Sequence, residues 1–154
     1  MSQTKEVIST LNSLIETCKD GQEGFRQAAE AVQDSELKSL FSEYSLQRAK
    51  FAGELQNFVI QLGEPEPEKT SSTAGALHRT WINLKSAITS RDDHAILAEC
   101  ERGEDSAVAE YKKAMDEDSR LSQPMRETVS RQYQDVKAAH DRVKALRDAT
   151  ASRF

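Results

Sequence analysis

Glycine and proline are scarce in this sequence, with six and three residues among 154. This scarcity argues against a β-rich fold, because strands joined by tight turns depend on both residues. No stretch approaches the roughly 20 apolar residues that a membrane-spanning helix needs. The first residues, MSQTKEVISTLNSL, also lack the apolar core of a signal peptide. We therefore expect a helical, cytoplasmic protein that does not enter a membrane.

Cysteine is almost absent as well, and positive charge is in the minority. Cys18 and Cys100 stand alone without metal-binding spacing, so we expect two free thiols that serve as packing groups. The net charge of -5 argues against nucleic-acid binding, which needs a basic surface, and it disfavours a DNA-shielding relative of the mini-ferritins. The sequence contains no glycine-rich phosphate loop, nucleophile elbow, CxxC or HExxH, and it therefore favours a non-enzymatic protein without catalytic residues.

Apolar residues recur at helical spacing in four long segments, 5–33, 35–62, 91–118 and 122–149. A long connection, 63–90, joins the second and third segments, and it contains a shorter predicted helix at 74–89. Trp81 is expected to seal this shorter helix against the other four. The pattern predicts one all-α domain over 1–154, a four-helix bundle with one long crossover of the ferritin-like kind.

Local residues refine the helix boundaries. Asp34 and Ser35 form a turn and cap signal before the second helix, and Gly63 is its expected stop. Gly21 and Gly24 interrupt the first helix, where each costs up to about 1 kcal/mol relative to alanine. They predict either a bend or a close backbone approach.

Several polar residues fall on the inward stripes of the helices, at heights near the middle of the bundle. Antiparallel neighbours can be aligned by residue number, and this alignment brings polar side chains from all four long helices to nearby levels. The residues expected in this polar layer are Gln22, Tyr44, Gln47, Arg48, Glu101, Glu104 and His140.

A buried carboxylate in this layer needs a partner, because an unpaired one costs several kcal/mol or becomes neutral. In one interpretation Arg48 pairs with Glu104 or Glu101, and the layer fixes how the helices align. In the other, Glu101, Glu104 and His140 hold one divalent ion such as Fe, Mn or Zn, with water completing the shell. No other cofactor is expected.

The Glu-x-x-His motif of di-iron carboxylate bundles is missing, which disfavours a di-metal oxidase. The residues three positions before His78, His94 and His140 are Gly75, Arg91 and Lys137.

Four runs carry a resemblance to a known family. They are DGQEGFRQAAE, LQRAKFAGEL, GALHRTW and AECERGEDSAVAEY, in that order. In their order and spacing they resemble an uncharacterised group of bacterial four-helix-bundle proteins, usually placed in the ferritin-like superfamily, over nearly the whole chain. The resemblance implies a ferritin-like bundle in a cytosolic bacterial protein, often in a stress-related context, and it carries over no catalytic residue.

The combined expectation is a non-enzymatic ferritin-like bundle of undefined role with a buried Glu/Arg/His layer. Such a protein would act through its surface or as a homodimer or higher homo-oligomer. The alternative is a metal-binding protein with a degenerate site on Glu101, Glu104 and His140.

Overall fold

The computed structural model describes residues 2–63, 81–116 and 120–151, and these residues contain helices and no β-strand. The prediction of an all-α protein is therefore confirmed for the described residues. The helices are α1 (Ser2–Ala31), α2 (Ser35–Gln61), α4 (Leu84–Ser90), α5 (Asp93–Asp116) and α6 (Gln123–Ala151).

In the described part of the connection between α2 and α5, the helix begins later than the sequence predicts. Residues 74–80 of the predicted helix, with His78, lie outside the described residues. After them the chain turns at residues 81–83, and α4 begins only at Leu84. The backbone N–H of Leu84 donates to the carbonyl of Trp81 at 3.1 Å, which closes that turn.

The predicted start and stop of α2 are confirmed. The Asp34 carboxylate accepts hydrogen bonds from the backbone N–H groups of Glu36 at 2.7 Å and Leu37 at 3.2 Å. These two donors have no partner within the helix, so the cap satisfies them. At the other end Gly63 has φ of 98°, a left-handed conformation that glycine adopts without a steric penalty.

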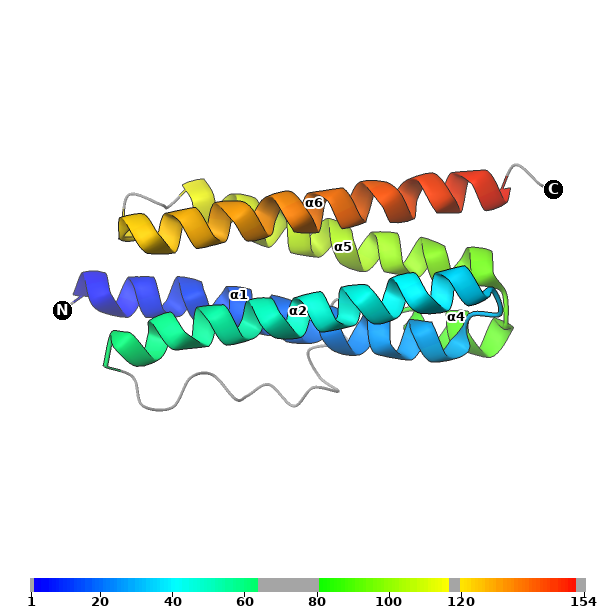
Figure 1. The fold of residues 1–154 in the computed structure, drawn as a ribbon, viewed down its shortest axis with the longest axis horizontal. Coiled ribbons are helices and arrows are strands. Elements are labelled where there is room, and N and C mark those ends of the chain that lie inside the picture. Colours follow the sequence, from blue (N-terminus) through cyan, green and yellow to red (C-terminus); the bar gives the residue numbers. More distant parts are fainter. Residues whose placement is uncertain (1, 64–80, 117–119, 152–154) are drawn as a thin grey trace.

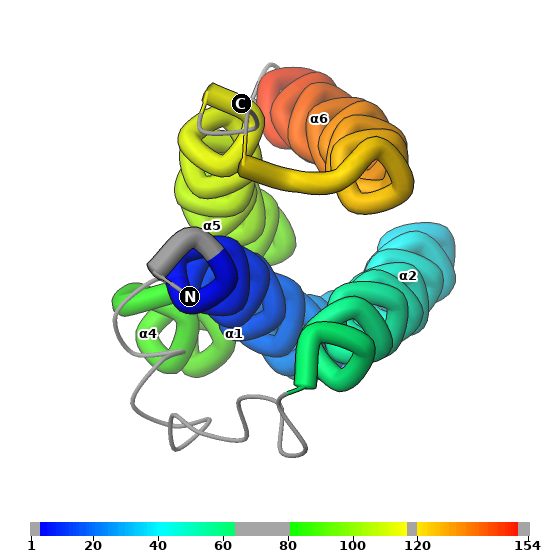
Figure 2. Tube along the Cα trace, turned by 90° about the vertical axis from the view of Figure 1, so that its left-hand side faces the viewer, coloured from blue at the N-terminus to red at the C-terminus, as the bar shows by residue number. Residues whose placement is uncertain are grey.

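The long helices form two antiparallel hairpins (Figure 1). One consists of α1 and α2, the other of α5 and α6, and α2 and α5 run in the same direction. The end-on view shows α4 outside the four long helices, beside α1 and α5 (Figure 2). The Asp93 carboxylate ties the two hairpins together at one end, because it accepts from the backbone N–H groups of Gln33 at 2.7 Å and Asp34 at 3.0 Å.

Two apolar clusters fill the bundle, one toward each end. The first cluster begins at Phe51 on α2 and at Ala107 on α5, and it continues toward the C-terminal ends of both helices. The second cluster lies nearer their N-terminal ends, and it ends near Phe41 on α2 and at Cys100 on α5. The level between the clusters therefore contains Arg48 on α2 and residues 101–106 on α5, at the height where the sequence analysis expects polar side chains.

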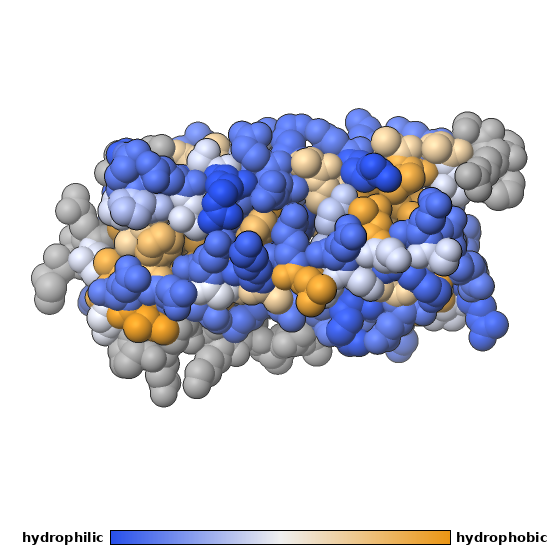
Figure 3. Space-filling view, in the orientation of Figure 1, coloured by the Kyte–Doolittle hydropathy of each residue, from blue (hydrophilic) through white to orange (hydrophobic). Residues whose placement is uncertain are grey.

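The outer surface is mainly hydrophilic, and Figure 3 shows apolar residues in separate patches on one face. Within the described residues, the large apolar side chains that are clearly exposed are Leu46, Ile60 and Ile82. None of the described helices combines the length and apolarity that crossing a membrane requires.

Candidate functional site

Arg48 and Glu104 form a two-pronged ion pair at the centre of the bundle. Arg48 Nη1 donates to Glu104 Oε1 at 2.6 Å, and Nη2 donates to Oε2 at 2.5 Å. Only 1% of each side chain is exposed. The planar guanidinium matches the carboxylate geometry, so both carboxylate oxygens are occupied by the same cation.

The rest of the Arg48 side chain is also enclosed. Its Nε donates to Gln47 Oε1 at 3.2 Å, and its Cζ lies 5.4 Å from the centre of the Phe25 ring. Burial works to lower the pKa of Arg48, but the adjacent Glu104 carboxylate outweighs burial and raises the pKa above its usual range. Arg48 therefore stays cationic. A methyl group at Gly21 would lie 3.1 Å from Arg48 Nη1, which explains the small residue there.

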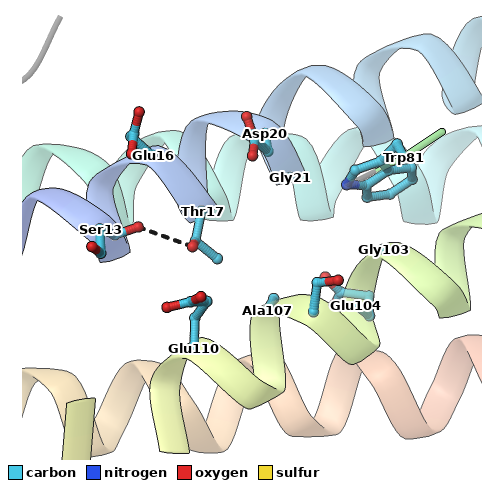
Figure 4. Close-up of a pocket in the computed structure, with 11 residues that line it drawn as sticks. Ser13, Glu16, Thr17, Asp20, Gly21, Trp81, Gly103, Glu104, Ala107 and Glu110 are labelled. Atoms are coloured by element: carbon cyan, nitrogen blue, oxygen red, sulfur yellow. Dashed lines mark hydrogen bonds between the residues drawn. The ribbon is translucent and has the colours of Figure 1, made fainter. Parts of the chain in front are cut away.

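Trp81 occupies a slot made by Gly24 and Gly103, and Figure 4 shows its ring on the side of α5 that carries Gly103 and Glu104. A methyl group at Gly24 of α1 would lie 2.6 Å from two carbons of the indole, and one at Gly103 of α5 would lie closer still. Any side chain at either position would therefore collide with the ring. The Trp81 ring also meets Phe25 edge-on, with 5.3 Å between centroids.

A second buried carboxylate, Glu99, holds the turn that follows Trp81. Glu99 Oε2 accepts from the backbone N–H of Asn83 at 2.9 Å, and Arg102 Nε donates to Oε1 at 3.1 Å. The Glu99 carboxylate on α5 thus fixes the turn before α4, and this turn sets how deeply the Trp81 ring is buried. The sequence analysis missed Glu99, although Arg102 three residues later is a standard partner on the same face of a helix.

A chain of buried polar groups crosses the first apolar cluster of the core. Tyr111 Oη donates to Gln132 Oε1 at 2.6 Å and lies 3.2 Å from Cys18 Sγ, so the thiol is the donor to the phenol oxygen. Gln132 Nε2 then donates to Glu54 Oε1 at 2.8 Å. Burial raises the pKa of Cys18 to about 11 and raises that of Tyr111 well above its usual value.

Both cysteines are free and buried, as predicted. Burial also raises the pKa of Cys100 well above its usual value. Both thiols therefore keep their protons at neutral pH, whereas nucleophilic chemistry needs the thiolate form.

A carboxylate–histidine cluster lies between α5 and α6, nearer the surface than the Arg48–Glu104 pair. His140 Nε2 lies 2.6 Å from Asp105 Oδ1 and 3.7 Å from Glu101 Oε1. On its other side His140 Nδ1 lies 3.0 Å from Asp141 Oδ1. The second oxygen of Glu101 accepts from Arg147 Nη1 at 2.7 Å.

Carboxylates on both sides of the ring favour protonated His140. Partial burial works to lower the pKa of His140, but hydrogen bonds to Asp141 and Asp105 outweigh burial and raise it. The reciprocal effect appears at Asp141, where the hydrogen bond with His140 is the main cause that lowers the pKa.

The residues expected in one polar layer occupy three environments. Arg48 and Glu104, with Gln47 beside them, lie in the interior. Glu101 and His140 lie near the surface between α5 and α6, with about one seventh of each side chain exposed. Gln22 is exposed and contributes only its backbone carbonyl, which accepts from Ser45 Oγ at 2.8 Å. Tyr44 is half-buried and packs against Phe25.

The proposed metal set of Glu101, Glu104 and His140 is not the group that the structure brings together. Arg48 donates hydrogen bonds to both oxygens of Glu104, and Asp105, rather than Glu104, lies beside His140. Within the described residues, Glu101, Asp105 and His140 each offer a ligand atom within 4.8 Å of the others. Asp105 follows Glu101 by one helical turn, and this i, i+4 spacing is the sequence signal that could have identified Asp105 as the third member of the cluster.

Comparison with protein families gave one relevant finding. A family described as "Domain of unknown function (DUF2383)" matches residues 6–117, which include most of α1 and all of α2, α4 and α5. Comparison with the curated proteins gave no match.

Proposed function

This chain belongs to the family described as domain of unknown function DUF2383, and we propose that it is a ferritin-like helical bundle without enzymatic activity. In this proposal the protein is cytoplasmic and bacterial, and it acts through its surface in a stress-related context. The observation that supports the proposal is the buried Arg48–Glu104 pair in the bundle core, the part of a ferritin-like bundle that holds its metal ligands.

The chemistry of this pair argues against an interior metal centre. A di-metal site needs several carboxylates with free oxygens pointing to one place. At the centre of this bundle the Glu104 oxygens bind a fixed cation instead, and the Arg48 charge would repel a second one. The pair joins α2 to α5, and neither oxygen of Glu104 is left free to bind a metal.

Aerobic oxidation of ferrous iron tests this proposal. We expect iron to oxidise at the same rate with this protein as with an unrelated helical protein at equal concentration, followed by absorbance. A faster reaction that scales with protein concentration and depends on Glu104 would contradict it.

Self-association is the second part of the proposal. Leu46 and Ile60 lie on α2 with 72% and 51% exposure, so α2 offers apolar surface that a second copy would cover. Light scattering coupled to size-exclusion chromatography should report a homodimer or a larger homo-oligomer. Leu46→Ser should weaken it, and a monomer at all concentrations would remove this part of the proposal.

A divalent ion at the carboxylate–histidine cluster is the alternative function. Glu101 and Asp105 supply oxygens, His140 supplies Nε2, and Asp141 holds the ring through Nδ1, as a supporting carboxylate does in many metal sites. The ion would replace the proton now shared between His140 and Asp105, and borderline ions such as Zn, Mn or Fe fit this donor set.

Metal analysis separates the two functions. Protein purified without chelator, and then equilibrated with zinc and dialysed, would contain one ion per chain if the cluster binds metal. His140→Gln and Asp105→Asn would lose the ion, whereas Asp135→Asn, at an exposed aspartate outside the cluster, would keep it. Metal-free protein after dialysis would exclude the alternative.

A further inference from the structure

The outward side of α2 carries a narrow stripe of small and apolar residues. They follow one another at spacings of three, four or seven residues, which places them on one side of a helix: Ser39, Ser42, Leu46, Ala49, Gly53 and Ile60. In the end-on view α2 occupies a corner of the bundle, and none of the other described helices covers its outward side (Figure 2).

The residues beside Leu46 leave room for a closely packed partner helix. Leu46 is 72% exposed, and the stripe continues from it with Ser42 on one side and with Ala49 and Gly53 on the other. A methyl group at Gly53 would meet nothing within 4 Å, so the chain itself does not fill the space there. Small side chains let two helix axes approach to about 8 Å. The stripe therefore offers a large side chain near its middle and small residues that can receive one.

A second copy of α2 fits this stripe in an antiparallel arrangement. When Leu46 of one copy packs on Ala49 of the other, Ser42 lies opposite Gly53, and a two-fold axis repeats both contacts. This axis lies about halfway along α2, so the two helices overlap over their whole length. One register thus places every large residue in the middle of the stripe against a small one.

Charged residues on one flank of the stripe favour the same arrangement. Glu43 and Lys50 are exposed, and within the described residues neither side chain makes an ion pair or a hydrogen bond. An antiparallel two-fold axis brings the same flank of both helices together, so Glu43 of each copy meets Lys50 of the other. A parallel pair would place this flank against the opposite one, where Ser45 and Ala52 are buried. The charges therefore complement a second copy in the antiparallel orientation.

We propose that two copies of this protein dimerise through their α2 helices, which pack antiparallel with Leu46 on Ala49 and with Glu43 beside Lys50 of the other copy. This inference rests on the self-association part of the proposed function, and it specifies the surface and the orientation of the interface. A single pair of helices is small for a specific interface, so we expect dimer and monomer in exchange.

Charge reversal tests the pairing of Glu43 with Lys50. Glu43→Lys and Lys50→Glu each turn both ion pairs into repulsions, and sedimentation velocity should show each variant alone dimerising about 5- to 20-fold more weakly. An equimolar mixture of the two variants restores both ion pairs between unlike chains, so its dimerisation should return to within about twofold of the unmodified protein. Lys144→Glu, at an exposed lysine of α6, should leave dimerisation unchanged. Circular dichroism melting curves check that all three variants fold.

Single cysteines test the orientation. Ala49 lies beside the two-fold axis, so a short bismaleimide should join two copies of Ala49→Cys. It should not join two copies of Ile60→Cys, because the antiparallel arrangement separates them by roughly 37 Å along the helices. The native Cys18 and Cys100 are buried and should not react in the folded protein. A parallel pair would cross-link both variants.

Three results would overturn the proposal. They are a dimer that the charge reversals leave unchanged, a dimer in which Ile60→Cys cross-links or Ala49→Cys does not, and a monomer at all concentrations. The first two leave self-association intact and remove only this interface. The third removes self-association as well, and an Ala49→Cys thiol that resists labelling would then show that another part of the same chain covers the stripe.

Discussion

Arg48 of α2 and Glu104 of α5 meet through two hydrogen bonds at the level that separates the two apolar clusters of the bundle. Each charge loses its hydration on burial, and the attraction between them offsets much of that cost only while both are present. A one-turn slip of α2 along α5 would bury each charge against apolar residues. The pair therefore penalises misaligned packing more than it strengthens the correct one.

The first prediction concerns the removal of one partner. Arg48→Met leaves the Glu104 carboxylate buried without a counter-charge, and we expect it to lower the free energy of unfolding by about 3–5 kcal/mol. Arg48→Met combined with Glu104→Gln should recover much of this loss. Urea denaturation of both single variants and the double variant gives the coupling energy.

The surface ion pair between Glu6 and Arg120 supplies the control for this cycle. Its atoms lie 3.1 Å apart, but about half of each side chain is exposed. Water already solvates both charges there, so Arg120→Met and Glu6→Gln should couple by less than about 1 kcal/mol. Additive effects of the Arg48 and Glu104 changes would mean that their contact contributes nothing specific.

The second prediction concerns the glycine slot. Gly103→Ala places a methyl group inside the indole of Trp81, so the ring must move, and we expect a loss of about 1–3 kcal/mol in the free energy of unfolding. The emission of Trp81 should shift as well, because the displaced ring meets water. Gly24→Ala should act in the same direction.

Gly53 of α2 is the matched control for these substitutions. It lies within a helix, and a methyl group there would meet nothing within 4 Å. Gly53→Ala should therefore stabilise the protein by about 0.5–1 kcal/mol, through helix propensity alone, without changing Trp81 emission. If Gly103→Ala behaved like Gly53→Ala, the slot would not constrain Trp81.

Helical periodicity was enough to predict the all-α fold and the height of Arg48 and Glu104, and the capping residues Asp34 and Gly63 predicted the start and stop of α2. These features follow from local rules and from the fixed rise of a helix. For Gly24 the sequence left a bend or a close backbone approach open, and the structure shows the Trp81 side chain against this residue. Its partner, Trp81, was not predictable, because that contact depends on the path of the connection after α2.

The carboxylate–histidine cluster shows what the height of a residue along its helix does not predict. Glu101 and Glu104 have similar heights, but three residues of helix rotate Glu104 toward α2 and Arg48. Asp105, a full turn from Glu101, shares its direction toward α6 and His140 instead. Height alone does not determine which neighbouring helix a side chain faces, and that choice decides between an ion pair and a metal ligand.

The third prediction concerns pH. The unfolded Cys18 thiol ionises near its ordinary pKa of 9.0, whereas the folded one keeps its proton until about pH 11. The folded state thus binds more protons in this window, and the free energy of unfolding should fall as pH rises from 9 to 11. Cys18→Ala should reduce that slope, measured by urea denaturation at pH 8, 9 and 10. An unchanged slope would mean that the thiol ionises equally in both states.

The last prediction concerns the buried hydroxyl of Tyr111. Tyr111→Phe keeps the ring but removes the donor to Gln132 Oε1 and the acceptor for the Cys18 thiol. Both partners stay buried without a replacement, so we expect the free energy of unfolding to fall by about 1–3 kcal/mol. Tyr133→Phe is the matched control, because Tyr133 is only partly buried and its hydroxyl makes no hydrogen bond within the described residues. Chemical denaturation should give a change of less than about 0.5 kcal/mol for this control. Equal effects of the two substitutions would show that water replaces the Tyr111 hydroxyl, and that the polar chain from Cys18 to Glu54 is not sealed from solvent.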